Sequence, residues 1–282
     1  MTNGTLATIS KIGLKLLDVI ERASGWAIFV DRPERIARKT LIEEIQHRSD
    51  LNSLEKQAMI SNVKRIMREY NNQRFIVEEA ISKLEETAKP EDVDEDWIVQ
   101  FMDKTRLVSD EEVQHIWAKL LAEECNDPNS VPKSLLFTLE RMSKEDAKAF
   151  VNICRLSVSI DNDFFPVIVS DKYEKDYYGK YDINYEVLLQ LDKLGLLENS
   201  IGKTGNFHTV SDNMLNDSQT KLSYFNHNYY VSGDVDSIPV GVVLLTKDGQ
   251  ALCKAISCDE APGFWDEMIL PWIEEINMGN EK

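Results

Sequence analysis

The tripeptide Gly202-Lys203-Thr204 has the residue types of a phosphate-binding loop, in which backbone N–H groups and a lysine hold a phosphate. Such a loop also needs a glycine five positions before Gly202, and that position holds Leu197. The preceding glycine, Gly195, is too far away. A buried strand before the loop and a helix after it are required as well, whereas these surroundings predict a loop leading to a strand. The tripeptide therefore predicts an ordinary loop.

The four histidines have neither the HExxH spacing nor any close metal-binding spacing. His208 and His227 could face each other across a predicted hairpin and bind a metal together with a cysteine, but nothing in their spacing requires it. His115 lies beside Trp117 on a predicted helix, which is typical of a structural histidine with its hydrogen bonds satisfied. His47 belongs to no such cluster. The sequence predicts no catalytic residue, no metal site and no cofactor.

Carboxylates cluster at 92–96 and 110–112. Paired carboxylates can hold Mg²⁺ or perform acid–base work, which normally places them in a cleft. Both clusters coincide with the starts of predicted helices, where the helix dipole favours negative charge. Asp94 is expected to cap one helix, and Ser109 with Glu112 to form a capping box on the next. We interpret these carboxylates as helix starts.

One basic stripe forms the candidate interaction surface. Asp31 can cap a helix, and Pro33 suits its first turn because the missing N–H has no partner there. Four basic residues of this helix share one face: Arg32, Arg35, Arg38 and Lys39. The stripe could bind a lipid headgroup, a nucleic acid or an acidic face of a partner. Alternatively it is a solvated face that pairs with neighbouring glutamates.

The net charge disfavours nucleic-acid binding. The chain has 32 basic and 49 acidic side chains among its 282 residues, a net charge of -17. Residues 1–80 hold 13 basic and 11 acidic side chains, so the acidic surplus belongs to the rest of the chain. Phosphate neutralisation supplies most non-specific nucleic-acid affinity, and an acidic region opposes it. A protein partner or self-association is the expected kind of contact.

A transmembrane helix is not expected. The apolar stretch 12–30 is interrupted by charges at positions 15, 18, 21 and 22, and a charge near mid-membrane costs about 2.5–3.5 kcal/mol. Residues 5–39 could still lie on a membrane surface. The dispersed cysteines show no CxxC pairing, and we find no secretory signal, so a cytoplasmic location and buried, free thiols are expected.

Apolar periodicity predicts a mostly α protein with a smaller α+β part. Three parts are expected: an N-terminal helical arm (1–89), a helical middle domain (90–160) and a C-terminal winged-helix-like domain (161–282). Helices are predicted at 6–20, from 31, at 53–71, 73–88 and 94–107, from 109, and at 134–142, 143–156, 184–194, 246–256 and 263–278. Strands are predicted at 165–169, 196–197, 207–210, 222–231 and 240–245.

The central blocks resemble a bacterial family catalogued as domain of unknown function 2806. The segments that carry the resemblance are Val93–Phe101, Val108–Glu124 and Leu139–Ala147, supported by Pro33–Ile36, Asn72–Ala80, Leu191–Leu196 and Leu245–Gly249. The family usually has a Pro-Gly-Ser-Phe-Ser-like turn where this chain has Pro128–Ser134. The resemblance implies a bacterial intracellular protein without an established activity, of a kind found in mobile and phage-defence regions.

The signature residues themselves predict packing. Six are apolar at helical spacing: Trp97, Phe101, Ile116, Trp117, Leu120 and Leu121. The sequence therefore favours a non-enzymatic interaction or regulatory protein, and the family resemblance implies a component of a phage-defence system. Two alternatives stay open: an effector enzyme or toxin-like protein with an unrecognised site, and a membrane-surface protein acting through its N-terminal amphipathic helices.

Overall fold

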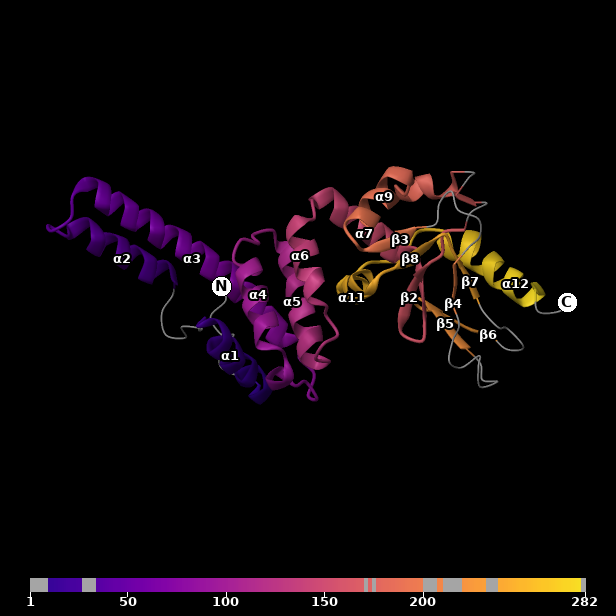
Figure 1. The fold of residues 1–282 in the computed structure, drawn as a ribbon, viewed down its shortest axis with the longest axis horizontal. Helices are drawn as coiled ribbons and strands as arrows, with labels where there is room; N and C mark the ends of the chain where they lie inside the picture. The colour runs from indigo at the N-terminus through magenta and orange to yellow at the C-terminus, as the bar shows by residue number, and fades with distance from the viewer. Residues whose placement is uncertain are drawn as a thin grey trace. The chain divides into compact units, whose positions relative to one another are not determined.

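The computed structural model describes residues 10–26, 34–169, 172–173, 176–199, 207–209, 220–231 and 238–279 (Figure 1). The chain divides into two compact units, Met1–Leu136 and Phe137–Lys282. The predicted three-part division at residues 89 and 160 stays a prediction. The general class is confirmed: the chain is mostly helical, and its antiparallel strands lie in the C-terminal part. The winged-helix likeness of that part stays a prediction.

Helices make up the described part of the first unit. They are α1 (Lys11–Ser24), α2 (Glu34–His47), α3 (Ser53–Ser82), the short turn η1 (Pro90–Asp92), α4 (Glu95–Thr105) and α5 (Glu111–Asn126), with α6 (Lys133–Arg141) crossing into the second unit. The predicted first helix begins later than expected, because Ser10 caps it by accepting from the Gly13 N–H. Residues 6–9 and 31–33 of the predicted helices lie outside the described residues.

The prediction of separate helices at 53–71 and 73–88 is wrong, because α3 is a single helix. The polar pair at 71–72 suggests a break when only the sequence is considered. In the structure Asn72 is buried, and its side-chain Nδ2 donates to the Arg106 carbonyl at 2.9 Å. A tertiary hydrogen bond thus keeps the asparagine inside the helix.

Side-chain caps fix most of the helix starts. Asp94 accepts from the Trp97 N–H, Ser143 forms a capping box with Asp146, and Asn184 accepts from the Val187 N–H, as predicted. The predicted Ser109 cap is wrong, since Asp110 accepts from the N–H groups at 112 and 113 instead. A carboxylate one residue later competes successfully because its charge also favours the helix dipole.

The core of the first unit is built around the family-like signature. The ring of Phe101 lies 5.1 Å from that of Trp97 and 5.3 Å from that of Trp117. The Trp97 indole N–H donates to the Val131 carbonyl at 3.0 Å. Leu120 and Leu121 are fully buried beside them. The signature therefore packs helices together, as its apolar spacing predicts.

The second unit holds a four-stranded antiparallel sheet in the order β2-β1-β5-β6. Its strands are β1 (Ser157–Ile160), β2 (Asp163–Pro166), β5 (Thr220–Tyr224) and β6 (His227–Val231). β3 (Leu197–Asn199) pairs with β8 (Val243–Leu245), and β4 (Phe207–Thr209) pairs with β7 (Ile238–Gly241).

Three strand predictions need correction. β1 was not predicted, and the predicted strand 165–169 is β2, which ends at Pro166. The predicted strand 222–231 is two strands joined by the turn Phe225–Asn226. The predicted strand 240–245 is divided between β7 and β8. The turn Phe225–Asn226 lacks the Gly and Pro signals that mark such breaks, whereas Pro166 and Gly241 lie at the other two.

Helices cover the sheet of the second unit. They are α7 (Lys144–Arg155), η2 (Tyr177–Tyr181), α9 (Tyr185–Lys193), α11 (Lys247–Ala255), the π-helical turn η3 (Trp265–Ile269) and α12 (Leu270–Gly279). Buried aromatic rings join the layers: Tyr224 lies 5.8 Å from Phe264, ring centre to ring centre. The Tyr224 hydroxyl donates to the Arg155 carbonyl at 2.9 Å and accepts from the Ala261 N–H at 3.0 Å.

Candidate interaction surface of the N-terminal helices

The first turn of α3 is tied to the end of α2, and the two helices run side by side in opposite directions (Figure 1). We call residues 34–71 the α2–α3 hairpin. Asn52 and Glu55 form a capping box at the start of α3. The Lys56 ammonium donates to the Gln46 carbonyl at 3.0 Å. These local bonds set where the chain reverses direction.

The structure describes the predicted basic stripe in part. Arg32 lies outside the described residues, and Arg35 and Arg38 lie on α2 with side chains that are also outside them. Lys39 is exposed, and its Nζ lies 3.7 Å from the Glu43 carboxylate. Exposed ion pairs of this spacing stabilise a helix by about 0.3–0.5 kcal/mol. The role of the stripe as a binding surface stays a prediction.

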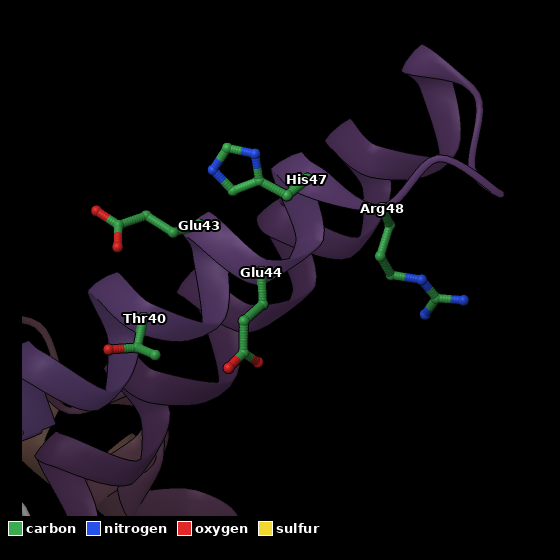
Figure 2. Close-up of a pocket in the computed structure, with 5 residues that line it drawn as sticks. All are labelled: Thr40, Glu43, Glu44, His47 and Arg48. Carbon is green, nitrogen blue, oxygen red and sulfur yellow. The ribbon is translucent and has the colours of Figure 1, made fainter.

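A shallow hollow of about 410 Å³ lies on α2, lined by Thr40, Glu43, Glu44, His47 and Arg48 (Figure 2). The Glu43 and His47 side chains leave one side of the helix, and those of Glu44 and Arg48 leave another. The Arg48 guanidinium bonds to Asp50 instead and lowers the pKa of that carboxyl. Side chains that diverge in this way do not form a catalytic pair.

The α2–α3 hairpin buries very little of its own surface. Among the described side chains at 39–71, Ile45 is the one that is buried, at 4% exposure. Four large apolar side chains are exposed: Leu41 by 42%, Leu54 by 75%, Met59 by 38% and Ile66 by 49%. Farther along α3, Ile76, Val77 and Ala80 are fully buried. The hairpin therefore buries fewer of its side chains than the C-terminal part of α3 does.

Helix α1 uses its apolar face within the first unit. Leu16, Val19 and Ile20 are buried, and α1 contacts α4. The Lys15 ammonium lies 2.5 Å from the Glu91 carboxylate, and Arg22 Nε lies 2.9 Å from that of Glu95. Helix α1 therefore packs on the first unit itself. No helix among the described residues is long and apolar enough to cross a membrane.

The carboxylate and histidine positions of the signature have structural partners. Asp94 accepts from the Trp97 N–H and lies 3.1 Å from the Lys133 ammonium, and these two contacts lower the pKa of Asp94. His115 Nδ1 lies 2.5 Å from Glu79 Oε2, which fits the predicted structural role. No group of three or more His, Cys, Asp and Glu side chains in the described ranges could hold a metal ion.

Sequence reasoning missed the buried carboxylate of Glu124. Its two oxygens accept from the N–H groups of Asn129 and Val131, each at 2.8 Å. Burial raises the pKa of Glu124, while the two N–H donors oppose the rise. The carboxylate therefore holds the turn after α5 closed. The adjacent Asp-Pro-Asn turn at 127–129 was the available signal.

Within the described ranges, the remaining sequence candidates do not assemble a site. Gly202-Lys203-Thr204 lies outside the described residues. The predicted hairpin that would bring His208 and His227 together is wrong, because β4 pairs with β7 and β6 pairs with β5. Among the thiols, Cys125, Cys154 and Cys253 are buried, and burial raises the pKa of Cys125 to about 12. A buried, protonated thiol behaves as a small apolar side chain.

The comparisons with known proteins agree with the central signature. No curated protein and no solved structure matches the chain significantly. One family model matches residues 43–269, which include the end of α2, helices α3 to α5 and the whole four-stranded sheet. Since this match covers well over half of the chain, the chain belongs to the family described as protein of unknown function (DUF2806).

Proposed function

We propose that the protein is a non-enzymatic interaction protein that self-associates through its α2–α3 hairpin. One observation supports this most directly. Ile45 is the one buried side chain among those described at 39–71, while Leu41, Leu54, Met59 and Ile66 expose apolar surface. Most helical stability in proteins comes from packing an apolar face against other elements. The hairpin needs such packing from another chain.

The exposed apolar side chains have a spacing that suits a second helix pair. Met59 and Ile66 are seven residues apart, so they lie two turns apart on one side of α3. This side borders the seam formed by the half-buried Ile60, Val63 and Met67. The core of a four-helix bundle needs apolar side chains on both sides of such a contact between two helices. A second hairpin supplies these side chains by two-fold symmetry.

The charge of the hairpin favours a second copy as its partner. Residues 34–71 hold eight Lys and Arg against six Asp and Glu, both signs interspersed. The whole chain has a net charge of -17. Two copies of a surface with mixed, nearly balanced charge can approach without strong repulsion, unlike two copies of the acidic remainder. The hairpin is thus the part of the chain best suited to self-association.

Light scattering of the full-length chain, combined with size-exclusion chromatography, tests the proposal. We expect a dimer at micromolar concentration, and a monomer for the double variant Met59→Glu/Ile66→Glu. Two charges buried in a small interface should weaken association by at least about a hundredfold. The control Ser61→Glu places one glutamate on the opposite side of α3, where Ser61 is exposed, and should stay dimeric.

A monomeric wild-type chain at every concentration up to about 100 µM, far above a dissociation constant of about 1 µM, would overturn the proposal. So would a double variant with the mass of the wild type. Far-UV circular dichroism at matched concentrations separates loss of association from global unfolding.

Association with phage-defence components is a further part of the proposal that the family resemblance supports.

Flotation with anionic vesicles distinguishes the membrane alternative. If the wild type floats with vesicles as a monomer and the double variant does not, the exposed side chains serve a lipid surface instead. The burial of Leu16, Val19 and Ile20 within the first unit favours the protein interface, because α1 then offers little apolar surface to a membrane.

A further inference from the structure

The two edge strands of the four-stranded sheet differ in how their outward backbone groups are hydrogen-bonded. At one edge, β2 is covered by the side chain of Gln250 from α11. The Phe164 N–H donates to Gln250 Oε1 at 2.8 Å, and Gln250 Nε2 donates to the Phe164 carbonyl at 2.8 Å. Since Phe164 lies opposite Ser159, next to the bonded pair at the β1–β2 turn, these groups point away from β1. The glutamine therefore closes this edge.

At the other edge, none of the described residues covers the outward backbone groups of β6 in this way. His227 lies opposite Tyr224 beside the two-residue turn, so that pair exchanges ladder hydrogen bonds. The alternation then points the N–H and C=O groups of Asn228 and Tyr230 away from β5. Within the part of the chain that the structure describes, these outward groups have no hydrogen-bond partner. The edge is ready to pair with another strand.

The sequence of β6 contains none of the usual protections of an edge strand. It reads His-Asn-Tyr-Tyr-Val, without proline, lysine or any other charged side chain. Proteins commonly place such residues at open edges to prevent pairing. Tyr230, 54% exposed, adds an aromatic side chain on the open face of the sheet. β6 thus combines open backbone groups with a side-chain contact.

The strand is held in place before any partner arrives. The ring of His227 stacks on that of Trp265, with centres 4.1 Å apart and planes 13° apart. Trp265 begins the π-helical turn η3, a type of turn that occurs frequently at functional sites. Tyr224, next to the β5–β6 turn, is fixed by its two hydroxyl hydrogen bonds. A rigid edge loses little entropy when a strand is added.

We propose that β6 is a docking edge that binds an extended, basic segment of another protein as an additional strand. Charge selects this partner over a second copy. The second unit holds 24 Asp and Glu against 13 Lys and Arg. At the turn end of β6, the Glu260 carboxylate lies 3.5 Å from His227 Nε2. A second copy would bring the same negative charge, whereas a basic segment neutralises it.

The two faces of the sheet predict how the segment's side chains alternate. Successive residues of a strand point to opposite faces. Basic side chains belong on the face that His227 shares with Glu260. Apolar ones belong on the open face beside Tyr230, where Lys221 of β5 lies opposite that tyrosine and disfavours further positive charge. Backbone pairing supplies affinity, and this alternation supplies specificity.

An eight-residue peptide that alternates lysine and valine is the probe, and its glutamate–valine counterpart is the control. Amide hydrogen exchange of the full-length ¹⁵N-labelled chain reports on Asn228 and Tyr230 directly. We expect exchange of both amides to slow at least about tenfold with the lysine peptide and to stay unchanged with the glutamate peptide. The amide of Tyr229, already bonded within the sheet, serves as the internal reference.

The variant Asn228→Pro removes one outward donor and leaves the backbone bonds to β5 intact, because proline is tolerated on edge strands. It also removes the side-chain oxygen that accepts from the Ser223 hydroxyl of β5 at 2.9 Å. We expect it to bind the lysine peptide about tenfold more weakly. The matched control Asn228→Ala loses the same side-chain contact with Ser223 but keeps the outward N–H, so it should bind as the wild type does.

Three results would overturn the proposal: equal binding of both peptides, binding without slower exchange at 228 and 230, or slow exchange there before peptide is added. Slower exchange that develops with protein concentration alone would assign the edge to a second copy instead. If Asn228→Pro does not fold, the exchange result on the wild type decides. None of these outcomes depends on the α2–α3 hairpin.

Discussion

At the residue scale, Glu124 shows what the signature's carboxylates do. The side chain is 1% exposed, and both oxygens accept N–H groups from the turn that follows α5. Burying a carboxylate is unfavourable unless hydrogen bonds compensate for the lost hydration. Here the Asn129 and Val131 N–H groups need acceptors, so the carboxylate and the two N–H groups satisfy each other's hydrogen bonds. The residue acts as a structural clamp.

Replacing Glu124 should destabilise the fold. Glu124→Ala leaves the N–H groups of Asn129 and Val131 without their acceptors. Val131 is buried, so its unsatisfied donor costs about 1–3 kcal/mol, whereas the exposed Asn129 contributes less. Glu124→Gln keeps one acceptor and should have a smaller effect. Urea unfolding at pH 7 measures both changes. The exposed neighbour Glu123→Ala is the control and should change stability by less than about 0.5 kcal/mol.

The same residue predicts a pH dependence. Burial raises the pKa of Glu124, so the folded state binds this proton more tightly than the unfolded state does. Its contribution to stability is complete below the unfolded pKa and is lost as the pH rises through the folded pKa. From pH 4 to pH 7, the wild type should therefore lose stability relative to Glu124→Gln. A relative gain would show that the N–H donors outweigh burial.

Residue-scale features were predictable where the interaction is local. Asp94 and Ser143 cap helices because acceptor and donor lie within three residues of each other. Ser109 failed as a cap because its neighbour Asp110 has the same local capacity plus a charge. Glu124 escaped prediction because its burial depends on how the next turn folds back over α5, which periodicity does not encode.

At the element scale, Gln250 closes one edge of the sheet. Gln250→Met keeps the side-chain size but leaves the Phe164 N–H and C=O unpaired, which should cost about 1–3 kcal/mol. Lys254→Met, one turn later on α11, removes an exposed contact with Asp163 and should cost less than about 0.5 kcal/mol. Thermal unfolding of both variants checks this, and equal midpoints would contradict the closing role of Gln250.

Element boundaries show where sequence reasoning stops. The turn Asp161–Asn162 has positive φ at both residues, which Asp and Asn tolerate, so this hairpin could have been predicted. The turn Phe225–Asn226 could not, because Phe225 has φ of 48°, a conformation that a bulky residue rarely adopts. Its ring contact with Tyr224, 4.9 Å between centres, helps to hold this turn in place. Tertiary packing thus overrides local preference.

At the scale of the whole molecule, the two proposed binding surfaces lie in parts of the chain that differ in net charge. The hairpin has nearly balanced charge, which suits the proposed self-association, while the second unit is acidic, which suits the proposed basic partner. Composition alone predicts that a nucleic-acid duplex is a poor partner, yet it cannot identify the α2–α3 hairpin as the proposed surface for self-association. The basic stripe made α2 a candidate surface. The small number of buried side chains at 39–71 could not be predicted, because burial depends on which other elements α2 and α3 contact.

Hydrogen exchange along α2 and α3 as a function of protein concentration tests the central claim most directly. We predict that amides at 39–71 are protected at high concentration and lose protection on dilution, because the hairpin folds stably only when a second copy covers it. Amides of α4 and α5 should be equally protected throughout. Protection of 39–71 that is independent of concentration would contradict the claim that these helices require a second chain.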